Sequence, residues 1–144
     1  MSAPLEEVRA WLAKAYTDLV AAQVLVAHSR LALGPAAFHC QQAAEKALKA
    51  YLIWRAVSFD RVHNLVYLSD LCEIEEPGFG SLREGTERLT PYAVDIRYPG
   101  DVLPVTLNEA REALAAAQAV WEFVLAELPP DLWEPPEGAH RPIC

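Results

Sequence analysis

Apolar residues recur at every third or fourth position through most of this chain, which is the spacing of one face of an α-helix. The first such stripe runs without interruption from Leu5 to Val26. It predicts a helix over residues 4–31, which ends before Gly34 because glycine commonly follows the last helical turn. A second helix is expected over residues 35–56, since proline is well suited to a first helical position.

Helical spacing continues beyond this pair, interrupted by segments rich in proline, glycine and acid. Thr106 and Glu109 form a capping box, a typical helix start. Thr90-Pro91 predicts a kink, because proline cannot donate its backbone hydrogen bond. Further helices are expected over residues 62–72, 80–97 and 106–128, with loops over residues 73–80 and 97–104.

No stretch alternates between apolar and polar residues as a strand would, so the expected fold is all-α. We expect an antiparallel, up-and-down bundle of four long helices and one short helix over residues 1–128. Residues 129–144 contain five prolines and should form an extended tail, with Trp133 as a potential docking residue. The helix over residues 106–128 is so apolar that it should be central in the bundle or meet a second copy of the chain.

Composition excludes several classes of protein. The 144 residues are 53% hydrophobic, which excludes a disordered chain. Their net charge of −8 argues against a protein that binds duplex DNA. No apolar run is long enough for a membrane span, and the acidic start has no apolar signal core. The odd, scattered cysteines (Cys40, Cys72 and Cys144) predict neither a disulfide framework nor a metal site, and fit a reducing cytoplasm.

Familiar catalytic motifs are absent from the sequence. It lacks the phosphate-binding, dinucleotide-binding, zinc-protease and serine-hydrolase patterns, and the Glu-x-x-His pairing of di-iron bundles. We therefore expect no cofactor and no resident metal. The candidate chemistry is confined to polar residues near helix faces and ends.

One side of the helix over residues 35–56 gathers most of these polar residues. Two interpretations are open: a solvated face with Glu45 and Lys49 as an ion pair one turn apart, or one wall of a groove that binds an anion or nucleotide. The residues on this side are His39, Gln42, Glu45, Lys46 and Lys49.

Two other positions are candidates for the same chemistry. Arg97 and Tyr98 precede a Pro-Gly turn, where an arginine either complements the end of a helix or contacts phosphate. His63 and Asn64 open the short helix expected over residues 62–72, where asparagine commonly acts as a cap. Asp18 lies at the edge of the first stripe and could pair with Lys14 or with a basic residue across the bundle.

Taken in order, these segments resemble the small prokaryotic HEPN domains, and the resemblance covers residues 8–128. The QQAAEKALKA segment followed by an RYP turn is the most specific part of it. The segments that carry the resemblance are WLAKAYTDLVAA, FHCQQAAEKALKAYL, VHNLVYL, YAVDIRYPG and TLNEAREALAAAQAVWEFV.

The resemblance implies a homodimer that acts with a small nucleotidyltransferase, frequently as toxin and antitoxin. It also implies a metal-independent ribonuclease site in many members: an arginine, four to six residues, then a histidine. Arg97 matches that arginine, but the following YPGDVLP contains no histidine. This departure argues against an enzyme, unless His39 or His63 takes the missing general acid–base role beside Arg97 and Tyr98.

Three functions follow as hypotheses. The first is a homodimeric partner subunit that binds nucleotide or RNA through Arg97, Tyr98, Lys46, Lys49, Gln42 and His39. The second is an endoribonuclease with an atypical site, for which the catalytic candidates are Arg97, Tyr98 and His63. The third is a structural or adaptor bundle without a ligand.

Overall fold

The computed structural model describes residues 4–94 and 104–136, in which the chain forms helices, turns and loops but no strand. This confirms the all-α bundle. None of the helices in those two ranges is both long and apolar enough to cross a membrane. The elements are α1 (Leu5–His28), α2 (Leu33–Trp54), α3 (Leu65–Glu75), η1 (Pro77–Leu82), α4 (Arg83–Leu89), η2 (Thr90–Tyr92) and α5 (Leu107–Glu127).

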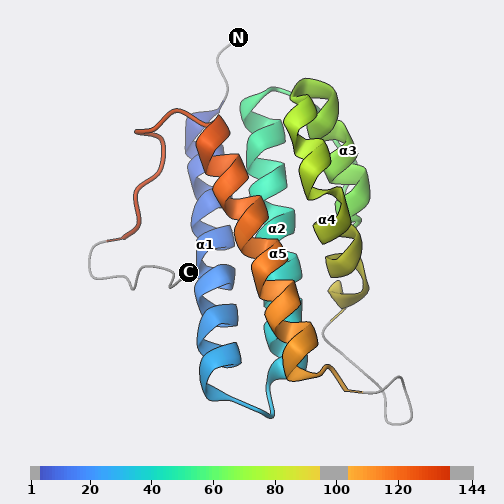
Figure 1. The fold of residues 1–144 in the computed structure, drawn as a ribbon. Coiled ribbons are helices and arrows are strands. Elements are labelled where there is room, and N and C mark those ends of the chain that lie inside the picture. Colours follow the sequence, from blue (N-terminus) through green and yellow to red (C-terminus); the bar gives the residue numbers. More distant parts are fainter. Residues whose placement is uncertain (1–3, 95–103, 137–144) are drawn as a thin grey trace.

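The central element is α2, which lies behind α5 in Figure 1, with α1 on one side and α3 and α4 on the other. Every residue from Ala36 to Trp54 is buried or half-buried. Its core side is rich in alanine, and small side chains let neighbouring helices approach closely. Polar residues on α2 are therefore covered as well as apolar ones.

The connection between α1 and α2 lies two to three residues earlier in the chain than the sequence predicts. Helix α1 ends at His28 and α2 already begins at Leu33, so Gly34 and Pro35 lie within the first turn of α2. A proline is tolerated there because first-turn N–H groups have no partner within the helix. The Oγ of Ser29 accepts a hydrogen bond from the backbone N–H of Ala32 at 3.1 Å, which closes the turn.

The segment expected as a helix over residues 62–72 begins and ends three residues later. The side chain of Asn64 accepts a hydrogen bond from the backbone N–H of Tyr67, which fixes the start of α3 and confirms the predicted cap. The predicted loop over residues 73–80 is the end of α3 followed by η1. There the Glu76 carboxylate caps the backbone N–H of Gly78 at 2.9 Å.

The helix expected over residues 80–97 is broken into shorter pieces. Only α4 is α-helical, and 3₁₀ turns flank it at both ends. The second of these turns coincides with Thr90-Pro91, where the sequence predicts an interruption. The end of the expected helix lies outside the described residues.

The capping box predicted at the start of α5 is present, with Thr106 and Glu109 bonded reciprocally. Helix α5 packs against α1, α2 and α4, so the chain's own bundle accounts for its apolar character. Its outer side remains exposed, and there Ala115, Ala119 and Ala126 alternate with charged residues such as Glu112 and Glu122.

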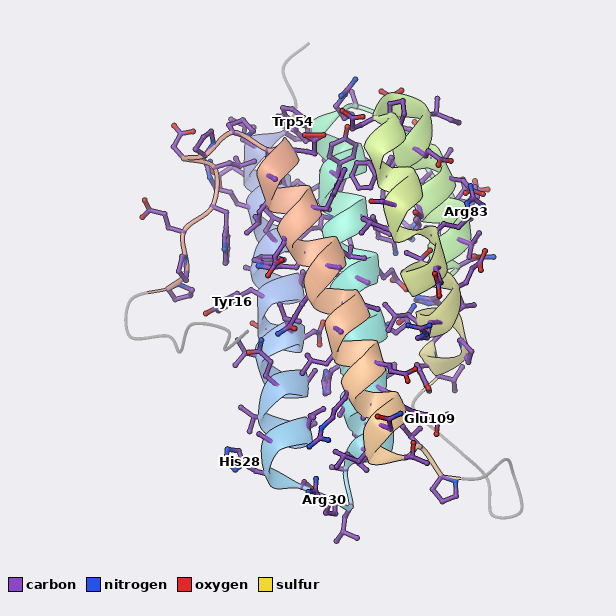
Figure 2. All side chains as sticks on the ribbon, in the orientation of Figure 1. Tyr16, His28, Arg30, Trp54, Arg83 and Glu109 are labelled. Atoms are coloured by element: carbon purple, nitrogen blue, oxygen red, sulfur yellow. The ribbon has the colours of Figure 1, made fainter. Side chains whose placement is uncertain are left out.

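The first residues after α5 pack against the bundle. Leu132 is buried, and its carbonyl accepts a hydrogen bond from Nε of Arg9 at 3.1 Å. The Trp133 ring lies 5.7 Å from that of Tyr16 and 6.0 Å from that of Trp121, centroid to centroid. Figure 2 shows Tyr16 on the side of α1 that faces this segment. Trp133 thus docks as the sequence allows.

A sharp reversal at the end of α2 sets the direction of the segment that leads to α3. The backbone N–H of Val57 donates to the carbonyl of Leu52, and that of Ala56 donates to the carbonyl of Ile53. These two bonds form a Schellman motif, in which the residue after the C-cap adopts a left-handed conformation. Ala56 occupies this position with φ of 58°.

Candidate functional site

The polar side of α2 forms two clusters, both of which involve residues from other parts of the chain. The Asp18 cluster consists of Asp18 from α1 with His39 and Lys46 from α2. The Glu45 cluster consists of Gln41, Glu45 and Lys49 from α2 with His63, which precedes α3.

In the Asp18 cluster, one carboxylate binds two nitrogen groups across the α1–α2 interface. Nζ of Lys46 donates to Oδ2 of Asp18 at 2.5 Å, and Nδ1 of His39 lies 2.8 Å from Oδ1. The Asp18 side chain is only 12% exposed, so these bonds are shielded from water. This confirms the expectation that Asp18 pairs with a basic residue across the bundle.

In the Glu45 cluster, a buried carboxylate accepts bonds from three side chains. Nζ of Lys49 donates to Oε2 at 3.0 Å, Nε2 of Gln41 donates to Oε1 at 3.2 Å, and Nδ1 of His63 lies 3.0 Å from Oε1. Gln41 also donates to the His63 backbone carbonyl at 3.2 Å. Buried charges require such multiple partners, because desolvation is otherwise very costly.

A large cavity borders the Glu45 cluster, where the segment after Ala56 returns along α2. Its volume is about 740 Å³, and the Lys49 ammonium lies 5.4 Å from the Trp11 ring centroid and 5.9 Å from that of Phe59. Both distances are within cation–π range. The lining residues are Glu7, Trp11, Lys49, Ile53, Val57, Ser58, Phe59, Arg61 and His63.

A smaller hollow of about 260 Å³ borders the Asp18 cluster. Asp18 and Lys46 line it together with Ala13, Lys14 and Thr17. Nζ of Lys14 lies 5.9 Å from the Trp11 ring centroid, so Lys14 and Trp11 separate this hollow from the larger cavity. Both openings are therefore on the α1–α2 side of the bundle.

The structure brings together most of the candidates that the sequence singled out. Gln42 joins the polar wall by donating to Oε1 of Gln41 at 2.7 Å. The predicted Glu45–Lys49 ion pair is present, but the interpretation of a solvated face is wrong for these two residues. Arg97 and Tyr98 lie outside the described residues, so their place beside Lys46 stays a prediction.

Several residues of these two hollows were not recognised in the sequence. Gln41 is buried and donates to both the Glu45 carboxylate and the His63 backbone carbonyl, although nothing in the sequence distinguishes it from its neighbour Gln42. Phe59 lies in an irregular segment without periodicity, and Trp11 belongs to the helical stripe. A helical projection places side chains around one helix, but it does not reveal which loop covers them.

The chemistry available in these clusters is electrostatic and hydrogen bonding. Burial raises the pKa of the Cys40 thiol to about 12 and also raises that of Cys72, so neither supplies a thiolate at neutral pH. Among the described residues, no three histidine, cysteine or acidic side chains form a group that could hold a metal ion. The arrangement suits binding of a charged ligand.

Comparison with known proteins places the fold in a family. The HEPN domain model matches residues 8–128. TT1696 from Thermus thermophilus superposes with a TM-score of 0.69 and is 32% identical, with 84% of this chain and 98% of that chain covered. ST0689, an archaeal HEPN homologue, has a TM-score of 0.67 and 23% identity, with 83% and 96% covered. No curated protein matches at a significant level.

The second of these similarities is too low in identity to show more than the fold. The domain match is stronger, because it extends over most of the chain and includes both polar clusters. The identity with the Thermus protein exceeds 30% over nearly its whole length. The chain therefore belongs to the HEPN family.

Proposed function

We propose that this protein is a homodimeric HEPN partner subunit that acts with a small nucleotidyltransferase in a toxin–antitoxin-like pair and binds a nucleotide or RNA. The observation that carries the ligand part is the Asp18 cluster beside its hollow. Lys46 and His39 are held by one carboxylate, so both nitrogen groups are oriented before a ligand arrives. Preorganised groups lose less entropy on binding.

Local charge supports a phosphate-bearing ligand in this hollow. The chain carries a net charge of −8, yet Lys14, Lys46 and His39 surround a single acid here. Within the described ranges, Lys14 forms no ion pair, so its ammonium is available to an incoming anion. Arg97 and Tyr98 would extend this surface if the segment after η2 returns to it.

Binding experiments test the ligand part directly. Isothermal titration with nucleotides and short single-stranded RNA should give saturable binding, and Lys46→Ala should weaken it about tenfold, because a charge-assisted hydrogen bond is lost. Arg111→Ala, which removes an exposed cation from α5, is the matched control. If both variants bind as the parent does, or if no probe binds, the chain is better explained as an adaptor bundle without a ligand.

The partner part rests on family membership, since HEPN proteins are often dimeric. On the outer side of α5, the exposed small residues Ala115, Ala119 and Ala126 would allow a helix of a second copy to approach closely. Co-expression with a small nucleotidyltransferase from the same genome, followed by gel filtration, should give a complex that contains two copies of this chain. Elution at monomer mass without a co-purifying partner would contradict the proposal.

The proposal places the protein in the cytoplasm, which agrees with the two free thiols of Cys40 and Cys72. Duplex DNA is not among the proposed partners, because the negative net charge of the chain opposes binding to phosphate backbones.

An endoribonuclease is the second candidate, and the Asp18–His39 pair favours it. A histidine oriented by a carboxylate is the usual arrangement of a general base. The test compares RNA cleavage by the purified protein with cleavage by Arg97→Ala and His39→Ala. If the parent cleaves RNA and both substitutions abolish the cleavage, the endoribonuclease is supported. If none of the three proteins cleaves RNA, this alternative is wrong.

A further inference from the structure

The cavity beside the Glu45 cluster is distinct from the hollow to which the proposed function assigns its ligand. Its volume of about 740 Å³ is in the range of small-molecule sites, which are mostly apolar and contain a few convergent polar groups. Trp11, Ile53, Val57 and Phe59 provide the apolar walls and are half-buried. Two of these four are aromatic, which favours a flat ligand.

Lys49 is the buried charged group of this cavity. Its side chain is 9% exposed, and its ammonium donates one hydrogen bond, to Glu45. An ammonium has three N–H donors. Because the described residues give Nζ one hydrogen-bond acceptor and place the rings of Trp11 and Phe59 near it, Lys49 retains donor capacity that an acceptor in the cavity can use.

Arg61 lines the same cavity and is exposed. Within the described ranges, its guanidinium forms no hydrogen bond or ion pair. A guanidinium is planar and matches a carboxylate with two parallel hydrogen bonds. The cavity therefore combines one buried and one exposed cation with aromatic walls.

Charge balance selects the type of anion. Lys49 and Arg61 are offset by Glu45, which is bonded within its cluster, and by Glu7. These four charges sum to zero, so a monoanion leaves a smaller net charge in this half-buried space than a phosphate dianion does. Desolvation penalties grow steeply with uncompensated charge.

We propose that this cavity binds a small aromatic carboxylate, with its ring against Trp11 and Phe59 and its carboxylate on Lys49 and Arg61. The ligand needs no phosphate, and the site shares neither Asp18 nor Lys46 with the hollow described above. The inference is therefore independent of the proposed nucleotide or RNA binding.

Isothermal titration of the full chain with phenylacetate tests the proposal. Saturable binding is expected with a Kd of about 0.1 to 1 mM, as suits a ligand of this size. Cyclohexylacetate, which has the same charge without an aromatic face, should bind more weakly, and inorganic phosphate should not compete. Failure of phenylacetate to bind would overturn the proposal, and so would displacement of phenylacetate by phosphate or by adenosine monophosphate.

Substitutions locate the bound probe. Arg61→Ala should raise the Kd of phenylacetate about tenfold, and because Arg61 is exposed, the fold should tolerate the change. Phe59→Leu keeps an apolar side chain but removes the ring, and should weaken phenylacetate more than cyclohexylacetate. Arg30→Ala, which removes an exposed cation at the opposite end of α1, is the matched control.

Lys46→Ala separates this site from the neighbouring hollow. It should weaken nucleotide or RNA binding and leave phenylacetate binding unchanged. Loss of phenylacetate binding in Lys46→Ala, or its persistence in both Arg61→Ala and Phe59→Leu, would show that the cavity is not the site.

Discussion

The Glu45 cluster and the ion pairs of Arg83 both join a carboxylate to a cation at similar distances, but the two differ in their exposure to water. Glu45 and Lys49 are 3.0 Å apart, with side chains 3% and 9% exposed. Arg83 lies 2.8 Å from Asp70, with both side chains nearly half exposed. Figure 2 shows Arg83 on the outer surface of the α3–α4 side. The distance between the charged atoms thus does not distinguish a buried ion pair from an exposed one.

The difference lies in the cover over each pair. Water screens the charges of Arg83, so each of its contacts adds little to the free energy of unfolding. Glu45 and Lys49 are covered by α1 and by the segment that returns after Ala56, so little water reaches either side chain and each depends on the other as a partner. Substitutions in these two groups of ion pairs should therefore have very different effects on the free energy of unfolding.

The apolar core sets the scale for this comparison. Trp121→Ala should lower the free energy of unfolding by about 4 kcal/mol, because a large buried ring leaves a cavity. Trp121 is 7% exposed and lies 5.9 Å from Tyr16, centroid to centroid. Urea denaturation gives the value, with half-buried Trp54→Ala as the control that should lose less. A loss below about 1 kcal/mol would mean that the core repacks around the gap.

Lys49→Met probes the buried pair and should cost about 3 kcal/mol, because it leaves the Glu45 carboxylate buried without its ammonium partner. Lys46→Met, one turn earlier and more exposed, is the matched control and should cost less. The double variant Glu45→Leu with Lys49→Met should recover most of the loss in the same denaturation experiment. Equal losses for Lys49→Met and Lys46→Met would remove the distinction drawn from burial.

Removal of residues 132–144 tests whether the segment after α5 belongs to the bundle. Leu132 is buried and Trp133 contacts two rings, so the truncation should cost about 2 kcal/mol, which combines lost apolar burial with regained chain entropy. Differential scanning calorimetry gives the change. A chain truncated after residue 136 is the control, and an unchanged melting temperature after the longer truncation would show that the docking is energetically neutral.

Arg83→Ala probes the exposed pairs and should leave the free energy of unfolding nearly unchanged. Added salt should shrink the effect further, since exposed charges are screened. Denaturation at low and high ionic strength measures both. A loss as large as that of Lys49→Met would show that exposure is a poor guide to the strength of these pairs.

Glu127→Gln should have the smallest effect and depend on pH. Burial and the neighbouring Glu76 carboxylate raise the pKa of Glu127 in the folded state. A raised carboxyl pKa adds stability at low pH, and that stability is lost as pH rises through the folded-state value. The variant should therefore melt about 1 °C higher than the parent at pH 7, with the gain absent near pH 4. A gain at acidic pH alone would contradict this sign.

Sequence periodicity predicted the helices because each one buries an apolar stripe against its neighbours. It predicted less well where a single side chain fixes a boundary, as Asn64 does for α3. The Glu45–Lys49 pair follows from spacing of four residues on a helix, whereas its burial does not. That burial depends on an irregular segment with Phe59 and His63, whose path no local pattern specifies.

The path of that segment depends on Ala56. Its φ of 58° lies in a region that residues with a side chain occupy at a cost of roughly 1 kcal/mol, and two backbone hydrogen bonds hold it there. A chain that left α2 along the helix axis would place neither Phe59 nor His63 beside the helix it had just completed. A single backbone torsion angle thus decides which side chains cover this end of α2.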